Sequence, residues 1–401
     1  MRNTIIGIVI GVVVGVMVGA TLVAPGLIDA RRDMANGANA KPSASSGTDA
    51  PLTIKDIKAS DQAAREELRP SGAIARADAA ATRQLRVISF IPPKAPVLGE
   101  VTAHFQHNLA ATTAGRVKVS LFAPGGLVDK EDSFDAARSA TVDAVFATTT
   151  QWAPNAPAMH LFTSIPFGPD ASEYMAWFYH GGGQKLYEGL FKRRGMHPLL
   201  CGATPPQGAG WYRNAVRQPD DLNGLNIRSQ GLGARVLQKL GAATKDMEPG
   251  QIMAAFEQGQ LDGAHHALPS VDAELGFNRF ARNAYFPAWQ SSLTLYTLAI
   301  NAKVWQRLDL SSRAALESAC SDNVRFAFTR TEAAQFEALK DLGLAGVQVR
   351  RWPDQVLDAL NAAWQETSRE LAQADSDFNA IWSSLHLFRR DFAIWRELSR
   401  P

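Results

Sequence analysis

Arg228 is the residue whose type and position most clearly suggest ligand recognition. It follows the short strand pattern Leu225-Asn226-Ile227 and precedes Ser229-Gln230-Gly231. Ligands of open α/β sheets bind outside the carboxyl ends of the strands, so the guanidinium is expected at the mouth of a cleft. Its planar fork of N–H donors matches the two oxygens of a carboxylate. The alternative, favoured by position alone, is a structural ion pair with a nearby Asp or Glu.

The adjacent histidines His265 and His266 follow another buried strand pattern and are expected at the same mouth. A zinc site would need further Cys, His or carboxylate ligands at suitable spacing, and none is evident. A catalytic histidine would need a partner nucleophile, but the sequence shows no Gly-x-Ser-x-Gly or comparable motif. Ligand contact and core packing therefore remain the two interpretations, and we expect no enzyme activity.

Three further residues have ambiguous roles. Gln207 lies in a Gly- and Pro-rich loop, where its amide could contact a ligand or cap a helix. Trp211 could form an apolar wall or pack a hinge. Lys94 directly follows a strand, so it could reach an anion or lie in solvent. Gly208 and Gly210 lack the spacing and the lysine of a phosphate-binding loop.

The segments that must position these residues form two copies of one pattern, β-α-β-α-β, which indicates parallel sheets flanked by helices. The first copy has strands at 86–91, 117–122 and 142–146 and helices at 99–113 and 130–139. The second copy has strands at 225–228, 244–247 and 261–265 and helices at 233–240 and 251–258.

The remaining pattern predicts how the two copies are joined. The alternating stretch 293–300 is typical of a strand that crosses between two lobes. Beyond it the chain is nearly all helical, with one strand at 347–352. We therefore predict an α/β fold of two lobes built on parallel sheets, with a hinge and long C-terminal helices.

Composition and cysteine content exclude several classes of protein. The 401 residues are 46% hydrophobic and 20% charged, with a net charge of +2, which fits a globular protein and gives no case for a nucleic-acid partner. The chain has two cysteines, Cys201 and Cys320, whose spacing matches no zinc site. An extracytoplasmic location would permit a disulfide, but two separate buried thiols are the favoured interpretation.

The first segment indicates the compartment. No charged residue lies between Arg2 and Asp29, and the apolar run is longer than the roughly 7–15 residues of a signal-peptide core. We predict a membrane anchor or uncleaved signal at 1–28, crossing the inner membrane through residues 5–27. The Ala-, Ser-, Gly- and Pro-rich composition of 29–84 predicts a flexible tether. We predict that 85–401 forms the folded domain of two discontinuous lobes.

Several motifs occur in the same order as in a known family. The stretches Trp177-Phe178-Tyr179-His180-Gly181-Gly182-Gly183 and Gln207-Gly208-Ala209-Gly210-Trp211-Tyr212-Arg213 are two of them. With 221–228, 275–277 and 388–395, they resemble the α-keto acid-binding branch of the TRAP transporter solute-binding proteins (DctP family) over residues 85–398. The resemblance implies a periplasmic receptor that delivers a small organic acid to a separate, ion-driven membrane permease. A membrane-tethered ligand sensor for a signalling partner is the alternative.

The resemblance also assigns roles to particular residues. It implies that Arg228 clamps the ligand carboxylate and that Gln207 contacts the ligand. The ligand-binding set predicted in this way consists of Arg228, Gln207, Trp211, His265, His266, Gln151, Trp152, Trp289 and Gln290.

A bridging cation is part of the branch's pattern, and this sequence departs from it. The branch holds the cation with a Gln side chain, a main-chain carbonyl and an acidic side chain, which would correspond here to Gln207, the carbonyl of His266 and the position of Gln290 or Ser291. Hard cations favour anionic oxygen ligands, and the acidic residue is missing. We therefore expect no cofactor, with sodium or calcium at Gln207, His266 and Ser291 as the disfavoured alternative.

Overall fold

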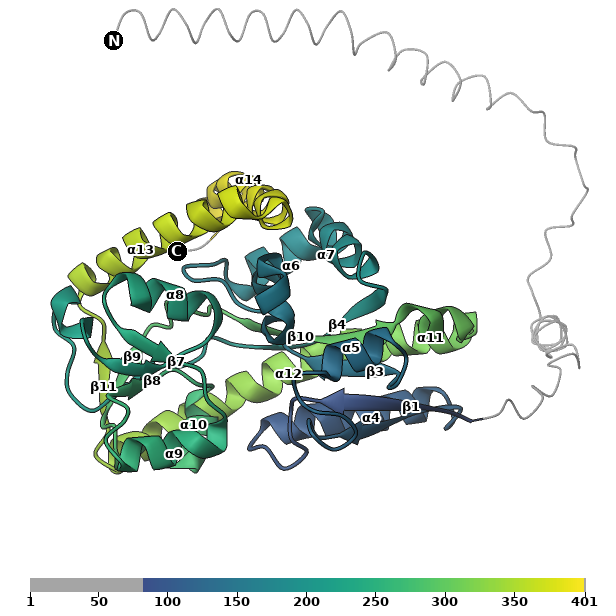
Figure 1. Cartoon of the computed structure of the whole chain (residues 1–401), viewed down its shortest axis with the longest axis horizontal. Coiled ribbons are helices and arrows are strands. Elements are labelled where there is room, and N and C mark those ends of the chain that lie inside the picture. Colours follow the sequence, from purple (N-terminus) through teal and green to yellow (C-terminus); the bar gives the residue numbers. More distant parts are fainter. Residues whose placement is uncertain (1–81, 400–401) are drawn as a thin grey trace, which may run out of the picture. The chain divides into compact units, whose positions relative to one another are not determined.

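A computed structural model describes residues 82–399 of the chain (Figure 1). The predicted anchor at 1–28 and nearly all of the predicted tether at 29–84 lie outside the described residues. Within 82–399, no helix is long and apolar enough to cross a membrane.

The first lobe is built on a five-stranded sheet with the order β2-β1-β3-β10-β4. Strands β1, β2 and β3 are parallel, whereas β10 runs antiparallel to both β3 and β4. The strands are β1 (Arg83–Ser89), β2 (Val117–Phe122), β3 (Ala144–Ala147), β4 (Met196–Thr204) and β10 (Thr294–Asn301). Helices α4 (Leu98–Thr112) and α5 (Ser133–Arg138) connect the parallel strands. The predicted first β-α-β-α-β unit is thus confirmed, although α5 begins later than expected.

The second lobe is built on a six-stranded sheet with the order β11-β9-β5-β8-β6-β7. Its strands are β5 (Trp211–Tyr212), β6 (Asn226–Arg228), β7 (Ala243–Lys245), β8 (Gly263–Ala264), β9 (Asn283–Phe286) and β11 (Gln348–Arg351). The helices are α8 (Gly231–Lys239), α9 (Pro249–Glu257) and α10 (Pro269–Leu275). Strand β6 pairs in parallel with β7 and β8, as the second predicted unit requires. Most of this sheet is inserted between β4 and β10 of the first, so both lobes are discontinuous.

Long C-terminal helices are present, as predicted, and one of them contacts both lobes, whereas the stretch 293–300, expected to cross between the lobes, forms β10 within the first sheet. Helix α12 (Leu310–Leu344) packs on β4 and α4 of the first lobe and on α10 of the second. Helix α13 (Asp354–Ala374) packs on α8, and α14 (Ser376–Ser399) packs on α6 (Ala171–His180) and α7 (Gly183–Lys192). Figure 1 shows α13 and α14, in yellow, along one side of the molecule. Short elements complete the described chain: α11 (Ala302–Arg307), η2 (Thr149–Asn155), η3 (Pro157–Phe162), η4 (Pro219–Leu222) and η5 (Phe277–Arg279).

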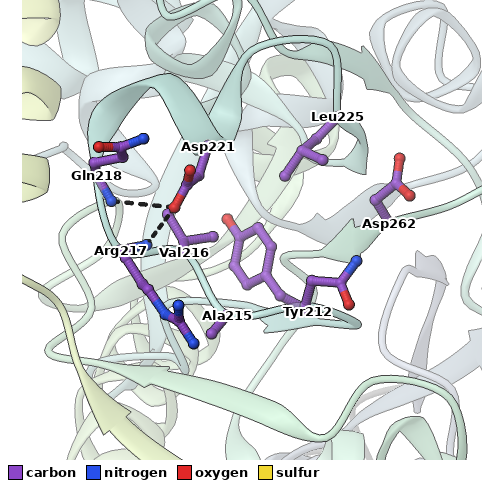
Figure 2. Close-up of a pocket in the computed structure, with 9 residues that line it drawn as sticks. Tyr212, Ala215, Val216, Arg217, Gln218, Asp221, Leu225 and Asp262 are labelled. Atoms are coloured by element: carbon purple, nitrogen blue, oxygen red, sulfur yellow. Dashed lines mark hydrogen bonds between the residues drawn. The ribbon is translucent and has the colours of Figure 1, made fainter.

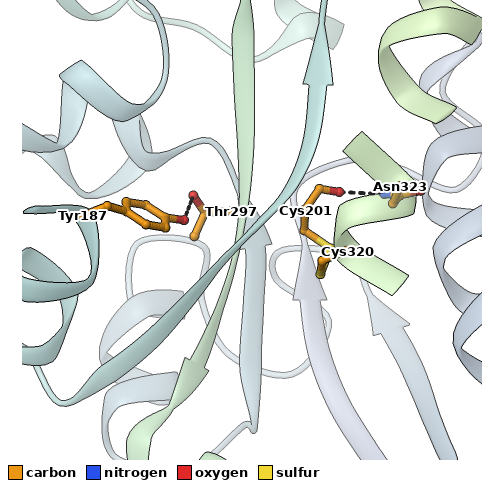
Figure 3. The surroundings of a disulfide bond; sticks show 5 residues. All are labelled: Tyr187, Cys201, Thr297, Cys320 and Asn323. Atoms are coloured by element: carbon orange, nitrogen blue, oxygen red, sulfur yellow. Dashed lines mark hydrogen bonds between the residues drawn. A yellow bond between two sulfur atoms is a disulfide. The ribbon is translucent and has the colours of Figure 1, made fainter. Parts of the chain in front are cut away.

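A disulfide bond ties strand β4 to helix α12 (Figure 3). Cys201 and Cys320 are bonded, which shows that the expectation of two separate thiols was wrong. The two residues are 119 positions apart in the sequence, and only the packing of α12 on β4 brings them together. Asn323, one turn along α12, fixes the same contact by donating from Nδ2 to the carbonyl of Cys201 at 2.7 Å.

Candidate functional site

A cavity of about 510 Å³ lies between the two lobes. Its wall includes residues that directly follow two parallel strands of each lobe. In the first lobe these are Phe90 after β1 and Thr148 after β3, and in the second lobe Ser229 after β6 and His265 after β8. The carboxyl ends of these strands therefore meet at one place, which is where ligands bind in open α/β sheets.

All of the predicted polar site residues line this cavity. The structure brings together Arg228, Gln207, His265, His266, Gln151, Gln290, Ser291 and Lys94. They come from segments spread over 94–291, so the fold brings together all of the polar residues in the predicted ligand-binding set.

The three predicted tryptophans do not line the cavity. Trp211 is buried beneath its wall and donates from Nε1 to Asp272 Oδ2 at 2.9 Å. Trp152 packs against Phe134, and Trp289 packs on the ring of Phe167. Large apolar side chains are more stable in the hydrophobic core than in a polar cavity wall. The three tryptophans therefore pack beneath the wall and do not contact the cavity.

Arg228 is 5% exposed and lines the cavity. Its Nη1 donates to the carbonyl of His265 at 2.7 Å and its Nε to the carbonyl of Met247 at 3.2 Å. A guanidinium carries five N–H donors, so these two bonds fix its orientation and leave donors for another group.

No buried carboxylate forms an ion pair with Arg228 within the described chain. The single ion pair found there joins Nη2 to Asp246 Oδ1 at 3.7 Å, and the Asp246 side chain is 68% exposed. Burial lowers the pKa of Arg228. The negative charges of Asp246, Asp272 and Glu248 raise this pKa, but by less than burial lowers it. A buried positive charge that lacks a close negative partner raises the free energy of the folded protein. The site is therefore suited to bind an anionic ligand.

His265 is held as a neutral ring. Burial, together with the positive charge of Arg228, lowers the pKa of His265 to about 3. Its Nε2 lies 2.8 Å from the hydroxyl of Tyr212, which is fully buried and has this single hydrogen-bond partner in the described structure. With Tyr212 donating to Nε2, the ring proton lies on Nδ1, which is buried and has no hydrogen-bond partner in the described structure. Gly210 makes room for the ring, because a Cβ there would lie 2.4 Å from His265 Cδ2.

His266 is oriented by a buried carboxylate. Its Nδ1 lies 2.7 Å from Asp272 Oδ1, and the second oxygen of Asp272 accepts from Trp211. Because a carboxylate only accepts, the Nδ1 of His266 carries the proton in this contact. Asp272 is 1% exposed and does not line the cavity, so its role is to position His266 and Trp211.

Neutral amides and hydroxyls form the junction between the lobes. Gln207 donates from Nε2 to Thr294 Oγ1 at 3.0 Å, and Ser291 Oγ lies 3.0 Å from the same hydroxyl. Gln290 donates from Nε2 to the carbonyl of Gly208 at 2.7 Å, while its Oε1 is buried without a partner in the described part of the chain. An unpartnered buried acceptor indicates a site for a ligand or water donor.

Sequence reasoning missed three residues that shape the site. Tyr212 sets the tautomer of His265, Asp272 orients His266, and Glu248 contributes a carboxylate to the cavity wall. Tyr212 lies within the motif 207–213, but no local pattern indicates that its hydroxyl contacts a histidine 53 positions away. Asp272 and Glu248 carry no distinctive local signal.

Lys130 and Glu248 form an ion pair that links the lobes at the cavity wall. Lys130 precedes α5 of the first lobe, and Glu248 precedes α9 of the second. The Lys130 and Glu248 side chains are 33% and 56% exposed, so the pair is worth about 0–1 kcal/mol.

Lys130→Ala is therefore expected to raise the ligand Kd by about two- to fivefold, because the arrangement of the lobes that encloses the ligand loses one stabilising ion pair. Calorimetric titration of the variant measures this change. Lys239→Ala, which removes the cation paired with Glu366 and Glu370 away from the cavity, is the control and should leave the Kd unchanged. An unchanged Kd in Lys130→Ala would show that the pair does not stabilise the enclosed state.

A second cavity, of about 550 Å³, lies on the second lobe beside Tyr212 (Figure 2). Asp221 faces it, but this carboxylate already accepts from the backbone N–H groups of Arg217 and Gln218 at 2.7 and 3.2 Å. Asp262 likewise accepts from the N–H of Asn226 at 2.8 Å. Both carboxylates are therefore already engaged by backbone N–H groups, Asp221 within a local turn and Asp262 across 36 positions of sequence, so this cavity is a weaker ligand site than the one between the lobes.

Comparison with known families decides what kind of protein carries this cavity. The model of bacterial extracellular solute-binding protein family 7 (DctP) matches residues 88–375. The chain belongs to this family. The resemblance noted in the sequence is confirmed, and with it the prediction of a TRAP-type solute receptor; nothing in the comparisons supports the sensor alternative.

Individual relatives of this DctP protein have known ligands. It is 27% identical to the monocarboxylate 2-oxoacid-binding periplasmic protein of Nostoc, over 73% of this chain and 80% of the relative. A TRAP transporter solute-binding protein from Bordetella bronchiseptica, with calcium and picolinate bound, is 30% identical with a TM-score of 0.76, covering 79% and 95% of the two chains. One from Colwellia psychrerythraea, with calcium and pyruvate bound, is 26% identical with a TM-score of 0.76, covering 79% and 97%.

The residues of this DctP protein fit such a cation poorly. In the described chain, no group of three or more His, Cys, Asp or Glu side chains is placed to hold a metal ion. Gln207, Gln290 and Ser291 offer neutral oxygens, and the carboxylate in the cavity wall, Glu248, is paired with Lys130. Calcium sites are normally rich in anionic oxygens, so the donor set lacks the charge that calcium prefers.

Proposed function

We propose that this DctP protein binds a small organic acid in the interlobe cavity and presents it to a TRAP-type membrane permease. The observation that carries the proposal is Arg228, a guanidinium that is 5% exposed and lines the cavity. Among residues 82–399, its only ion-pair partner is a distant, exposed carboxylate. A ligand carboxylate would compensate this charge with charge-assisted hydrogen bonds. Gln207, Gln151, His265, His266 and Gln290 would complete the contacts, without catalysis.

A thermal-shift screen of the full chain tests this function. Carboxylates that bind in the cavity should raise the melting temperature in proportion to the logarithm of their concentration, because they bind only the folded state. The matched amides, which keep the shape and lose the charge, should have no effect. Equal shifts from acids and amides would contradict the proposal.

We also propose that binding is independent of a bridging cation. The neutral side chains of Gln290 and Ser291 stand where the sequence comparison expects an acidic ligand. The Kd for a 2-oxo acid should therefore stay within about twofold when calcium is removed with a chelator and sodium is replaced by potassium, since no anionic ligand for either ion is lost. Calorimetric titration in the two buffers measures it.

The matched variant for this test is Gln290→Glu, which adds the missing carboxylate at nearly constant shape. Its affinity should become calcium-dependent. If the unmodified protein instead loses affinity in chelator and regains it with sodium or calcium, the cation mechanism operates and the proposal is wrong.

The location proposed for the receptor is the periplasm, with the segment 5–27 holding it in the inner membrane. The family description as extracellular supports the compartment, and the charge-free apolar run supports the anchor. Fractionation of the full-length protein tests the anchor. Recovery of a mature form that begins after Ala20 or Ala40 in the soluble periplasmic fraction would contradict it.

A further inference from the structure

One part of the cavity wall is apolar along most of its length. The segment 90–98, which follows β1 and ends on the first residue of α4, contributes six lining residues with apolar side chains: Phe90, Ile91, Pro92, Ala95, Pro96 and Leu98. Most of them are only partly buried, so their apolar surface is not fully used by the core. Tyr296 of β10 continues this surface, and Val271 and Leu275 of α10 add apolar groups from the second lobe.

The backbone at the end of the segment 90–98 is sterically constrained at two positions, Val97 and Gly99. Gly99 is required at its end, because a Cβ there would lie 2.3 Å from the carbonyl oxygen of Pro93. Val97 has a φ of 57°, a strained conformation for a β-branched residue. Such strain persists only where the surroundings enforce it, and it gathers at ligand clamps and similar sites.

The charges of the cavity leave one buried cation free for an anionic ligand. Arg228 has the incomplete compensation already described. Lys130 is neutralised by Glu248. Lys94 lies on the apolar segment but is exposed, so its charge is screened by water. A ligand with one carboxylate matches this arrangement better than one with two.

The size of the cavity exceeds what a three-carbon acid needs. Its volume of about 510 Å³ falls within the roughly 300–1,000 Å³ typical of pockets that enclose drug-sized ligands. A pyruvate-sized acid on Arg228 would leave the apolar segment in contact with water.

We infer that the preferred ligand is a monocarboxylate with a substantial apolar body, its carboxylate on Arg228 and its apolar body against the segment 90–98. This inference rests on the proposed function and makes the ligand class more specific. Burying apolar surface of the ligand against Phe90 and Leu98 would supply affinity in proportion to the area removed from water.

A homologous series of 2-oxo acids tests the inference by calorimetric titration of the full chain. From pyruvate through 2-oxobutanoate and 2-oxopentanoate to 2-oxohexanoate, the Kd should fall about fourfold for each added methylene. A Kd that is constant or rises along the series would overturn the inference while leaving the proposed function intact. Failure of every acid to bind would reject the proposed function and the inference with it.

Paired variants locate the apolar contact. Phe90→Ala should raise the Kd for 2-oxohexanoate by about tenfold and change that for pyruvate far less. If Phe90→Ala does not fold stably, Leu98→Ala, which removes a smaller side chain, replaces it in the test and should also raise the Kd for 2-oxohexanoate more than that for pyruvate. Phe336→Ala is the control, because Phe336 is 72% exposed on α12 and does not line the cavity. Equal effects of Phe90→Ala on both acids would contradict the placement.

Discussion

Arg228→Ala is expected to abolish most of the affinity for a carboxylate ligand, raising the Kd by about 30-fold to several thousand-fold. This range corresponds to the roughly 2–5 kcal/mol lost when one partner of a buried, hydrogen-bonded charge pair is removed. The reason is specific to the site: the guanidinium is 5% exposed, and no other buried cation in the described cavity wall is free to replace it. Calorimetric titration of the variant measures the loss.

Two controls separate ligand recognition from stability. Arg228→Lys keeps the charge but not the planar fork, so an intermediate Kd is expected. Arg217→Ala removes a guanidinium that lines the other cavity and should leave the Kd unchanged. The free energy of unfolding of Arg228→Ala should also be measured in urea, because the side chain bonds two backbone carbonyls. A folded variant with unchanged affinity would make Arg228 a structural residue.

The second large effect concerns the disulfide. Replacing both Cys201 and Cys320 by alanine is expected to lower the free energy of unfolding by about 2–5 kcal/mol. The bond closes a loop across 119 residues of sequence, and in the chain-entropy account long loops restrict the unfolded chain most. Urea denaturation of the two proteins under oxidising conditions measures the difference.

The response to reductant provides the internal control. The double variant should unfold identically with and without reductant, whereas the unmodified chain should be destabilised only once it is reduced. Reduction of the native protein should be slow, since both cysteines are buried at 0% and 1% exposure. Equal stability of the unmodified and double-variant proteins would show that the bond does not form in solution.

The elements that position the site could be predicted because their signals are local. Strand β2 lies at 117–122, as its apolar alternation and the following Pro124-Gly125-Gly126 indicate. Both β-α-β-α-β units were recognisable for the same reason. The place of Arg228 at the end of β6 followed directly, because a residue after a parallel strand must lie at the edge where ligands bind.

What sequence reasoning could not supply depends on contacts between distant segments. The Cys201–Cys320 bond requires α12 to pack on β4, and β4 itself was not predicted because its partner β10 lies about 100 residues later. The tryptophans illustrate a second limit. Trp152 and Trp289 stand next to cavity-lining glutamines, but successive side chains need not face the same way, and their rings pack into the core.

The most direct test of the central claim is a crystal structure of the protein with a bound 2-oxo acid, grown in the presence of calcium. The ligand carboxylate should lie on Arg228 between the two lobes, within hydrogen-bonding distance of its free N–H groups and with no cation between ligand and protein. A ligand in the cavity beside Tyr212, or one whose carboxylate does not contact Arg228, would contradict the claim.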